Sequence, residues 1–284
     1  MRNRQDGGLS RASERDGGSN ERALNPALHG CETFDFAPAD LPALRERLRA
    51  WPAFSVHAPL PTPPDYPGSP AISFLLDPDP LKRRASLDML HQTIRVAAEW
   101  GAWYVVVHFG GVHSDGLSAQ DVRGLADGAA ARLDSWAEMH GMPLHLEYAA
   151  YNPSFAAPED LLDVVRRYPY LHVCLDVGHL RVGAEMLSVD EWKAARLLAP
   201  YTRSMHLWTA RGREDVRRYY HVPVHPSLTP ADGWIDVPRM LELVLAHDPD
   251  CAIVFEPHDL YNPDPNWQAE GIAWVRDIVV SYRP

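Results

Sequence analysis

Several short apolar stretches of the sequence end in a residue that can bind a metal or move a proton. Six of them finish at or beside a histidine, an aspartate or a glutamate: His57, His108, Glu147, Asp176, His206 and Glu256. A buried lone carboxylate is costly, and three of them close together repel one another. Carboxylate oxygens and imidazole nitrogens are common ligands of divalent cations. The set therefore predicts a metal site, in which a cation offsets the negative charge.

Each of these residues, taken alone, has a simpler interpretation. A histidine at a strand end often makes an ordinary hydrogen bond, and an acid there often caps the next helix. Glu147 and Glu256, however, are followed by YAAYNP and PHDLYNP, which are loop sequences and not helix starts. The shared position of all six residues favours the metal site. His179, three residues after Asp176, is a weaker candidate for substrate contact, a second metal or simple packing.

The apolar stretches that carry these residues alternate with segments of helical periodicity. Strands are predicted at residues 31–36, 54–60, 103–110, 144–149, 172–178, 203–209 and 252–258. Helices are predicted near residues 40–50, 79–100, 118–140, 158–168, 188–199, 236–247 and 266–281. Ser118 and Ser188 each stand three residues before an acid, which is the pattern of a capping box at a helix start.

Repeated β-then-α units of about thirty residues indicate a parallel sheet. Their number favours an α/β protein with a (β/α)8 TIM barrel over an open doubly wound sheet. Only seven strands are recognised, so the first strand is weak or missing; it should precede residue 31, where only ALNPALHG is available. In a parallel barrel the carboxyl ends of the strands converge on one mouth, and active sites of this fold lie there.

The composition fits one globular domain. Of the 284 residues, 46% are hydrophobic and 23% are charged. Residues 1–24 are polar and rich in Gly, Ser and Arg, so they are predicted to form a disordered tail before a single barrel at 25–284. Cys31, Cys174 and Cys251 form no C-x-x-C pair, which suggests reduced thiols and a cytoplasmic protein. No apolar run approaches the ~18 residues of a membrane helix, and the N-terminus lacks the apolar core of a secretory signal.

The charge and the motifs exclude several other chemistries. The formal net charge is −11, which repels nucleic acid at long range, although a local basic stripe could still bind it. The lysines, Lys82 and Lys193, both lie in predicted helices, whereas a Schiff-base aldolase needs a lysine on a barrel strand. The sequence contains no G-x-S-x-G, H-E-x-x-H, P-loop or G-x-G-x-x-G pattern. The loop after the last strand has no glycine with which to bind phosphate, which favours an unphosphorylated substrate.

The longest irregular segment follows His206 and extends to DGWIDVP. Long loops are uncommon in compact domains unless they act as lids or binding loops. This one carries cationic and imidazole side chains at Arg211, Arg213, His221 and His225. It is either a lid that faces a ligand or an exposed loop with solvated charges.

From about residue 30 to residue 284 the sequence resembles the xylose isomerase-like TIM barrels. This superfamily includes sugar isomerases, ketose 3-epimerases, inosose dehydratases and type-IV apurinic endonucleases. Glu147, Asp176, His206 and Glu256 match the four metal ligands of the family in order, spacing and strand position, and LDVGH resembles its Asp-x-x-His signature. The resemblance implies that these four residues bind a metal and that His179 contacts substrate.

In the isomerases and epimerases of this family, two glutamates both hold the metal and move protons. The resemblance implies one divalent ion, Mn²⁺, Mg²⁺, Co²⁺ or Zn²⁺, which stabilises the enediolate of a sugar or a similar hydroxyketone as a Lewis acid. Glu147 would take a proton from one face of the substrate and Glu256 would return one to the other, or the reverse. His179 and Arg213 are expected to hold substrate oxygens. The predicted function is a metal-dependent sugar isomerase or epimerase, whose oligomeric state is left open.

Two further functions remain open. The endonuclease branch uses additional histidines for a cluster of zinc ions, and His57 and His108 match two of those positions; in the isomerase interpretation they are substrate contacts. That branch expects an Asp-x-His pair after the sixth strand, where this chain reads HVPVH, and the acidic balance argues against DNA. The third hypothesis is a degenerate, non-catalytic barrel that binds a sugar. Four aromatic residues near the mouth would stack on a sugar ring or simply pack: Trp208, Tyr219, Tyr220 and Trp234.

Overall fold

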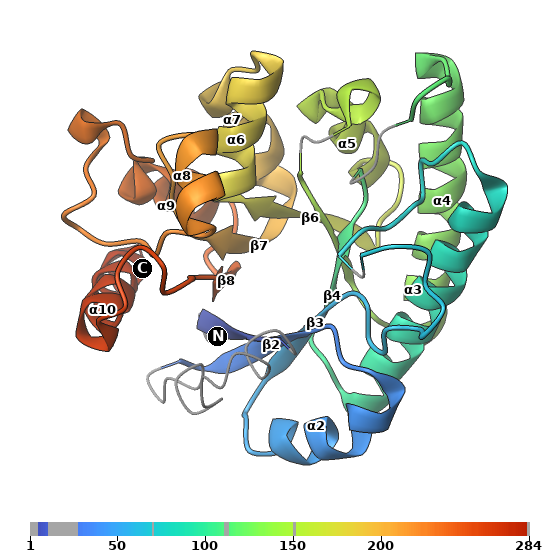
Figure 1. Ribbon diagram of the computed structural model, residues 1–284, viewed down its shortest axis with the longest axis horizontal. Coiled ribbons are helices and arrows are strands. Elements are labelled where there is room, and N and C mark those ends of the chain that lie inside the picture. The colour runs from blue at the N-terminus through green and yellow to red at the C-terminus, as the bar shows by residue number, and fades with distance from the viewer. Residues whose placement is uncertain (1–4, 11–27, 70, 111–113, 150–151, 283–284) are drawn as a thin grey trace.

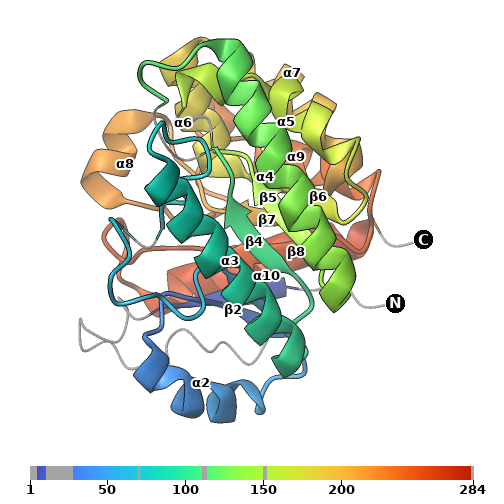
Figure 2. The ribbon, with the colours of Figure 1, turned by 90° about the vertical axis from the view of Figure 1, so that its right-hand side faces the viewer.

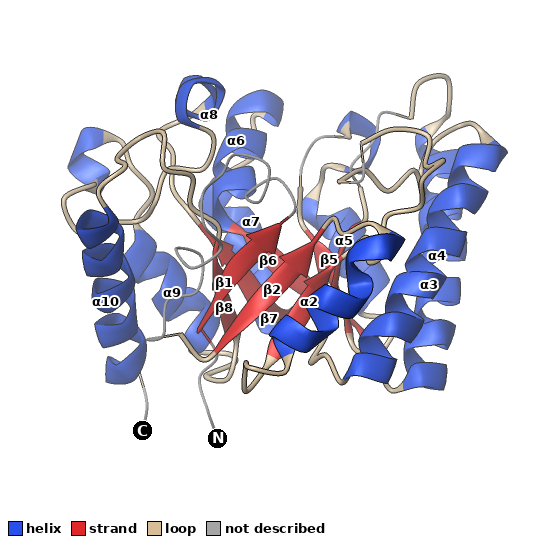
Figure 3. Ribbon diagram, turned by 60° about the horizontal axis from the view of Figure 1, so that its bottom comes forward, coloured by secondary structure: helices blue, strands red, loops and turns tan. Residues whose placement is uncertain are grey.

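The chain forms a closed parallel barrel. The computed structural model describes residues 5–10, 28–69, 71–110, 114–149 and 152–282. The strands follow one another around the barrel in chain order, and the helices lie outside it (Figures 1 and 3). They are β1 (Gln5–Ser10), β2 (Gly30–Phe34), β3 (Phe54–His57), β4 (Val105–His108), β5 (Leu144–Glu147), β6 (Leu171–Asp176), β7 (Thr202–Leu207) and β8 (Ala252–Phe255). The predicted α/β barrel is confirmed.

The helices of the described residues cover the outside of the barrel. They are α2 (Leu41–Leu48), α3 (Pro80–Trp100), α4 (Ala119–His140), α5 (Pro158–Val165), α6 (Val177–Leu187), α7 (Glu191–Leu198), α8 (Arg213–Tyr219), α9 (Val237–Leu245) and α10 (Pro265–Ser281). Short 3₁₀ turns occur at Pro38–Asp40, Pro153–Phe155, Ala199–Tyr201 and Pro230–Asp232. None of these helices is both long enough and apolar enough to cross a membrane.

Two helices were not predicted, and one predicted cap is wrong. Helix α6 follows β6 without a loop, because the carboxylate of Asp176 accepts the backbone N–H of His179 and caps the helix at once. Helix α8 lies inside the segment after His206 that was predicted to be irregular. Ser118 forms the predicted capping box with Asp121, whereas Ser188 ends α6 in a left-handed conformation and Asp190 caps α7 instead.

The eighth strand is β1, much earlier in the chain than expected. It pairs in parallel with β2, from Asp6 opposite Gly30 to Ser10 opposite Phe34, and with β8 on its other side. This strand was expected just before residue 31, and residues 1–24 were predicted to form a disordered tail. Both predictions are wrong for Gln5–Ser10. The segment QDGGLS lacks the apolar run that identified the other strands, and backbone pairing on both sides defines it instead. The other residues of the predicted tail lie outside the described residues.

The alternation of side chains along each strand separates two buried layers. Leu144, Leu146, Val173 and Leu175 belong to the large apolar core that packs between the barrel and its helices. The side chains at the alternate positions, such as His145 and Glu147, point into the barrel. Because strands β2 to β8 are covered on both faces, their sequences read as nearly continuous apolar runs. The few polar residues in these runs are therefore concentrated inside the barrel.

The strand register brings the chemically active residues to one mouth. His108 lies opposite Glu147 on the neighbouring strand, and Asp176 lies opposite His206. All these residues stand at or near the carboxyl ends of parallel strands, where a barrel of this kind opens. The fold therefore gathers residues from distant parts of the chain into one cluster.

Candidate metal centre and active site

Acidic and imidazole side chains face one another at the mouth of the barrel. The donor cluster consists of Glu32 on β2, His57 on β3, His108 on β4, Glu147 on β5, Asp176 on β6, His179 on α6, His206 on β7 and Glu256 after β8. Three groups each place three donor atoms within 4.8 Å of one another: His57, Glu147 and His206; His108, Glu147 and His179; and Glu32, His206 and Glu256. All six strand-end residues named from the sequence are brought together here.

Glu147 lies at the centre of the donor cluster. Its Oε2 is 3.0 Å from His57 Nε2, 2.7 Å from His108 Nε2 and 3.7 Å from His206 Nδ1. Its Oε1 is 3.4 Å from His179 Nε2. Burial opposes ionisation of this side chain, but the adjacent imidazoles, first His108 and then His57 and His206, together outweigh it and hold the pKa of Glu147 well below its usual value. Glu147 is therefore a buried carboxylate surrounded by imidazoles.

Asp176 is oriented by hydrogen bonds to both of its oxygens. Oδ1 accepts the backbone N–H of His179 at 2.6 Å, and Oδ2 accepts the indole N–H of Trp208 at 2.9 Å. Oδ2 also lies 3.8 Å from His206 Nδ1, so the carboxylate borders the cluster. Burial and the nearby charge of Glu147 raise the pKa of Asp176 to about 6.

His206 lies between two sets of carboxylates. Its Nδ1 is 3.2 Å from Glu256 Oε1, and its Nε2 is 2.9 Å from Glu32 Oε1. Burial raises the pKa of Glu256 to about 8, and the charges of Asp176 and Glu147 add to the effect although His206 opposes it. Glu256 is the most exposed of the four acids, at 22% of its side chain.

The donor cluster fits a divalent cation. Within the described part of the chain, four of its buried atoms make no hydrogen bond: Glu32 Oε1, Glu147 Oε1, His206 Nδ1 and His206 Nε2. Buried polar atoms normally have a partner, so a group of unsatisfied donor atoms facing one another implies an absent ligand. A cation beside Nδ1 would satisfy Glu147 Oε1 and His206 Nδ1 while it offsets the mutual repulsion of the acids, whereas Glu32 Oε1 and His206 Nε2 lie 2.9 Å from each other. The mixture of carboxylate and imidazole suits Mn²⁺, Mg²⁺, Co²⁺ or Zn²⁺.

Comparison with known proteins agrees with the fold. A family model described as a xylose isomerase-like TIM barrel matches residues 26–278. The chain belongs to this family. None of the curated proteins compared matches the sequence.

Several solved structures are similar to this chain at low sequence identity. An L-ribulose 3-epimerase is 15% identical with a TM-score of 0.70, covering 100% of this chain and 96% of its own. A D-allulose 3-epimerase from Methylomonas sp., in complex with D-allulose, is 12% identical with a TM-score of 0.67 and 98% coverage of both chains. A Thermus thermophilus protein, TTHB071, soaked with ZnCl2, is 22% identical with a TM-score of 0.55 and 99% coverage of both chains. At these identities the similarity shows the shared fold.

Of the other residues predicted from the sequence of this xylose isomerase-like barrel, His179 and His221 lie at the donor cluster, whereas Arg213 and His225 make no contact with it among the described residues. His179 borders the donor cluster, and burial lowers its pKa to about 4, so its imidazole is neutral. His221 stacks on Trp208 with ring centroids 4.1 Å apart, and its Nδ1 is 3.8 Å from Glu256 Oε2. Among the described residues the Arg213 side chain makes no ion pair or hydrogen bond with the cluster, so its contact with substrate stays a prediction. His225 stacks on Trp267 instead of joining the donors.

The four aromatic residues near the mouth differ in exposure. Trp208 is fully buried and Trp234 is 6% exposed, so neither presents a face to a ligand. Tyr219 packs against Tyr261. Tyr220 alone of the four is largely exposed, at 60%, and it stacks on the imidazole of His258. Stacking on a sugar ring therefore remains a prediction for Tyr220.

Sequence reasoning missed Glu32. This acid lies in the middle of β2 and is 3% exposed. Because Glu32 does not end its strand, it was not among the strand-end donors predicted from the sequence. The available signal was an acid within the otherwise uncharged stretch CETF, because a buried carboxylate there requires a partner.

Gly178 is the residue that allows Trp208 to reach Asp176. A Cβ at this position would overlap the indole ring of Trp208. We expect Gly178→Ala to lower the free energy of unfolding by about 1–3 kcal/mol, as for other overpacked cores. Gly128→Ala in α4 is the matched control, because no atom lies within 4 Å of its added Cβ. Urea unfolding should show the control unchanged or stabilised by about 0.5–1 kcal/mol, and equal midpoints for Gly178→Ala and the wild type would contradict the packing argument.

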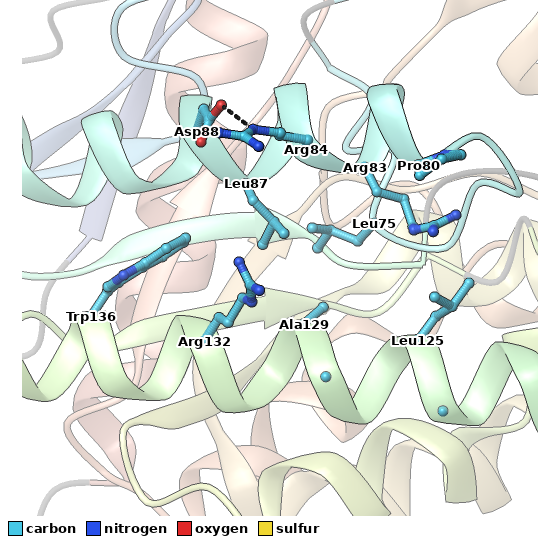
Figure 4. Close-up of a pocket in the computed structure, with 12 residues that line it drawn as sticks. Leu75, Pro80, Arg83, Arg84, Leu87, Asp88, Leu125, Ala129, Arg132 and Trp136 are labelled. Carbon is cyan, nitrogen blue, oxygen red and sulfur yellow. Dashed lines mark ion pairs between the residues drawn. The ribbon is translucent and has the colours of Figure 1, made fainter.

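Helices α3 and α4 lie side by side on the outside of the barrel (Figure 2), and a separate hollow lies between them (Figure 4). It has a volume of about 490 Å³ and is lined in part by Arg83, Arg132 and Trp136 (Figure 4). An ion pair between Arg84 and Asp88 lies along one side of it. No residue of the donor cluster lines this hollow, so it is not part of the candidate metal centre.

Proposed function

We propose that the protein is a metal-dependent sugar isomerase or epimerase. The observation that carries the proposal is the placement of Glu147 and Glu256 beside the same atom, His206 Nδ1, at 3.7 Å and 3.2 Å. The two carboxylates come from β5 and from the end of β8, with β6 and β7 between them. Moving a proton off one face of a substrate and onto the other requires two such groups on different sides of the site.

Glu147, Asp176, His206 and Glu256 would hold one divalent ion. When bound, the ion would act as a Lewis acid that polarises the carbonyl group of a hydroxyketone sugar. Glu147 or Glu256 removes the proton next to that carbonyl, and the other carboxyl group returns one. His179, whose imidazole is neutral, would bind a substrate oxygen. The epimerases named among the structural neighbours support a sugar as substrate. The buried thiols of Cys31, Cys174 and Cys251 agree with a cytoplasmic location.

His57 and His108 leave a second candidate function open. Both place Nε2 against Glu147 Oε2, an arrangement that could bind a further zinc ion, as in a zinc phosphodiesterase of the endonuclease type. His225, however, is turned toward Trp267, so it supplies no donor for a third metal. The net charge of −11 also disfavours DNA. We therefore rank this function second and expect His57 and His108 to contact the sugar.

Hydrogen exchange between solvent and sugar tests the proposal. The protein, freed of metal and reloaded with Mn²⁺, Mg²⁺, Co²⁺ or Zn²⁺, is incubated in D₂O with a panel of unphosphorylated ketopentoses and ketohexoses. We expect NMR to show deuterium next to the carbonyl only with the metal-loaded protein. Glu256→Gln should lose this exchange and bind less metal. Glu46→Gln, a change at an exposed glutamate on α2, should keep both.

Two results would contradict the proposal. One is cleavage of abasic DNA by the zinc-loaded protein without any exchange into sugars. The other is a metal content of Glu256→Gln equal to that of the wild type, since Glu256 would then not be a ligand.

A further inference from the structure

We propose that Glu32 is a positioning residue, which holds the Nε2–H of His206 so that Nδ1 presents its lone pair to the metal. The inference rests on the metal centre of the proposed function and extends it to a residue outside the four ligands. An imidazole binds a metal only through a nitrogen that carries no proton. The partner of the other nitrogen therefore decides which edge of the ring is available.

The two nitrogens of His206 face different carboxylates. Nδ1 points to the acids of the centre, at 3.2 Å from Glu256, 3.7 Å from Glu147 and 3.8 Å from Asp176. Nε2 lies 2.9 Å from Glu32 Oε1. A proton on Nε2 thus meets a carboxylate, whereas a proton on Nδ1 would occupy the position that a cation needs.

Glu32 is itself held in place. Strand β2 pairs with β3 so that Glu32 lies opposite Ser55, and the Ser55 hydroxyl donates a hydrogen bond of 2.8 Å to Glu32 Oε2. Glu32 and Ser55 are 3% and 0% exposed. Because Ser55 occupies Glu32 Oε2, Glu32 Oε1 is the oxygen that remains to accept the Nε2–H of His206.

Glu32 could instead bind the metal directly. Its carboxylate lies within 4.8 Å of donor atoms of His206 and Glu256. However, Glu32 lies against Nε2, while the other three acids gather around Nδ1. A ligand of the same ion would have to reach past the imidazole, so positioning fits the geometry better than coordination.

Zinc binding and the protonation of His206 together test the proposal. The probe is Zn²⁺, with affinity measured by chelator competition and the state of each ring nitrogen read from long-range ¹H–¹⁵N NMR of histidine-labelled, zinc-loaded protein. In the wild type we expect zinc on Nδ1 of His206 and a proton on Nε2. Glu32→Ala should weaken zinc binding by about 10–100-fold, the usual effect of losing such a partner. Glu32→Gln keeps an oxygen that accepts the Nε2–H, so its affinity should stay within about tenfold of the wild type.

Asp77→Asn is the matched control. Asp77 is also a buried acid, at 7% exposure, and it pairs with Lys82 outside the donor cluster. Its substitution should leave zinc affinity and the His206 spectrum unchanged.

Three results would overturn the proposal. The first is zinc on Nε2 of His206 in the wild type, a measurement that requires no variant to fold. The second is wild-type zinc affinity in Glu32→Ala. The third is an equal loss in Glu32→Ala and Glu32→Gln with His206 still protonated on Nε2, which would make Glu32 a ligand. None of these readouts uses a sugar, so the proposed function can fail while this inference holds, and the reverse.

Discussion

Glu147→Gln should lower kcat/KM for sugar turnover by about 10³-fold or more, toward the upper end of the range for loss of a general acid or base. The amide keeps the shape of the side chain but can neither accept a proton nor carry a charge. Three imidazole Nε2 atoms, those of His57, His108 and His179, lie within 3.4 Å of its oxygens and would lose their common carboxylate. Initial rates of the reloaded enzyme, at saturating metal, measure the effect separately from metal affinity.

Glu191→Gln provides the control for this substitution. Glu191 is also a largely buried glutamate, with 11% of its side chain exposed, and it pairs with Arg181 outside the donor cluster. Its substitution should cost stability but leave kcat/KM within a few-fold of the wild type. If Glu147→Gln kept its rate within tenfold at saturating metal, Glu147 would not be the proton-transfer group.

The sequence was sufficient to predict most of the barrel and to name seven of the eight residues of the donor cluster, all except Glu32. Strands buried on both faces read as continuous apolar runs, so β2 to β8 could be located without any tertiary information. Within such a run a terminal histidine or acid is conspicuous, as at His108 or Glu147. Parallel strands in a barrel share one mouth, which was enough to expect these residues to meet. Their roles as ligands and acid–base groups remain predictions.

What could not be predicted depends on partners that are distant in the chain. Strand β1 has no apolar pattern, and its place is defined by backbone pairing with β2 and β8. The role proposed for Glu32 depends on strand β7, which places His206 beside it. The sequence named His221 in a possible lid, but it could not distinguish this residue from His225, because the stacking of His221 on Trp208 depends on the path of the segment in the fold. The cap at Asp176 is local, and the rule that an acid at a strand end often caps the next helix describes it; what was not predicted is the helix itself, Val177–Leu187.

Adding a saturating divalent cation to metal-free protein should raise the Tm by about 5–10 °C, and by more at pH 8 than at pH 6. A ligand present at 100 times its Kd contributes about 2.7 kcal/mol, and each kcal/mol shifts a chain of this size by about 2–4 °C. The pH dependence follows from the acids of the centre. The pKa of Asp176 is raised to about 6 and that of Glu256 to about 8 in the metal-free fold.

An acid whose pKa is raised by folding stabilises the protein fully only below its unfolded value, and this contribution is lost as the pH rises through the folded value. The metal-free protein should therefore lose stability from these two groups between about pH 4 and pH 8. A cation binds the ionised carboxylates, so protons compete with it least at pH 8, where the metal-free centre is also most repulsive. Both effects make the increase in Tm larger at pH 8.

Differential scanning calorimetry of metal-free and metal-loaded samples at the two pH values measures this difference. Glu256→Gln removes the acid with the highest pKa of the centre, so its increase in Tm should be smaller and should depend less on pH. Asp77→Asn should retain both the increase and its pH dependence, because this acid lies outside the donor cluster. An equal or larger increase at pH 6, or none at either pH, would mean that no cation joins these carboxylates, and the acids would then have to be held together by protons and imidazolium groups alone.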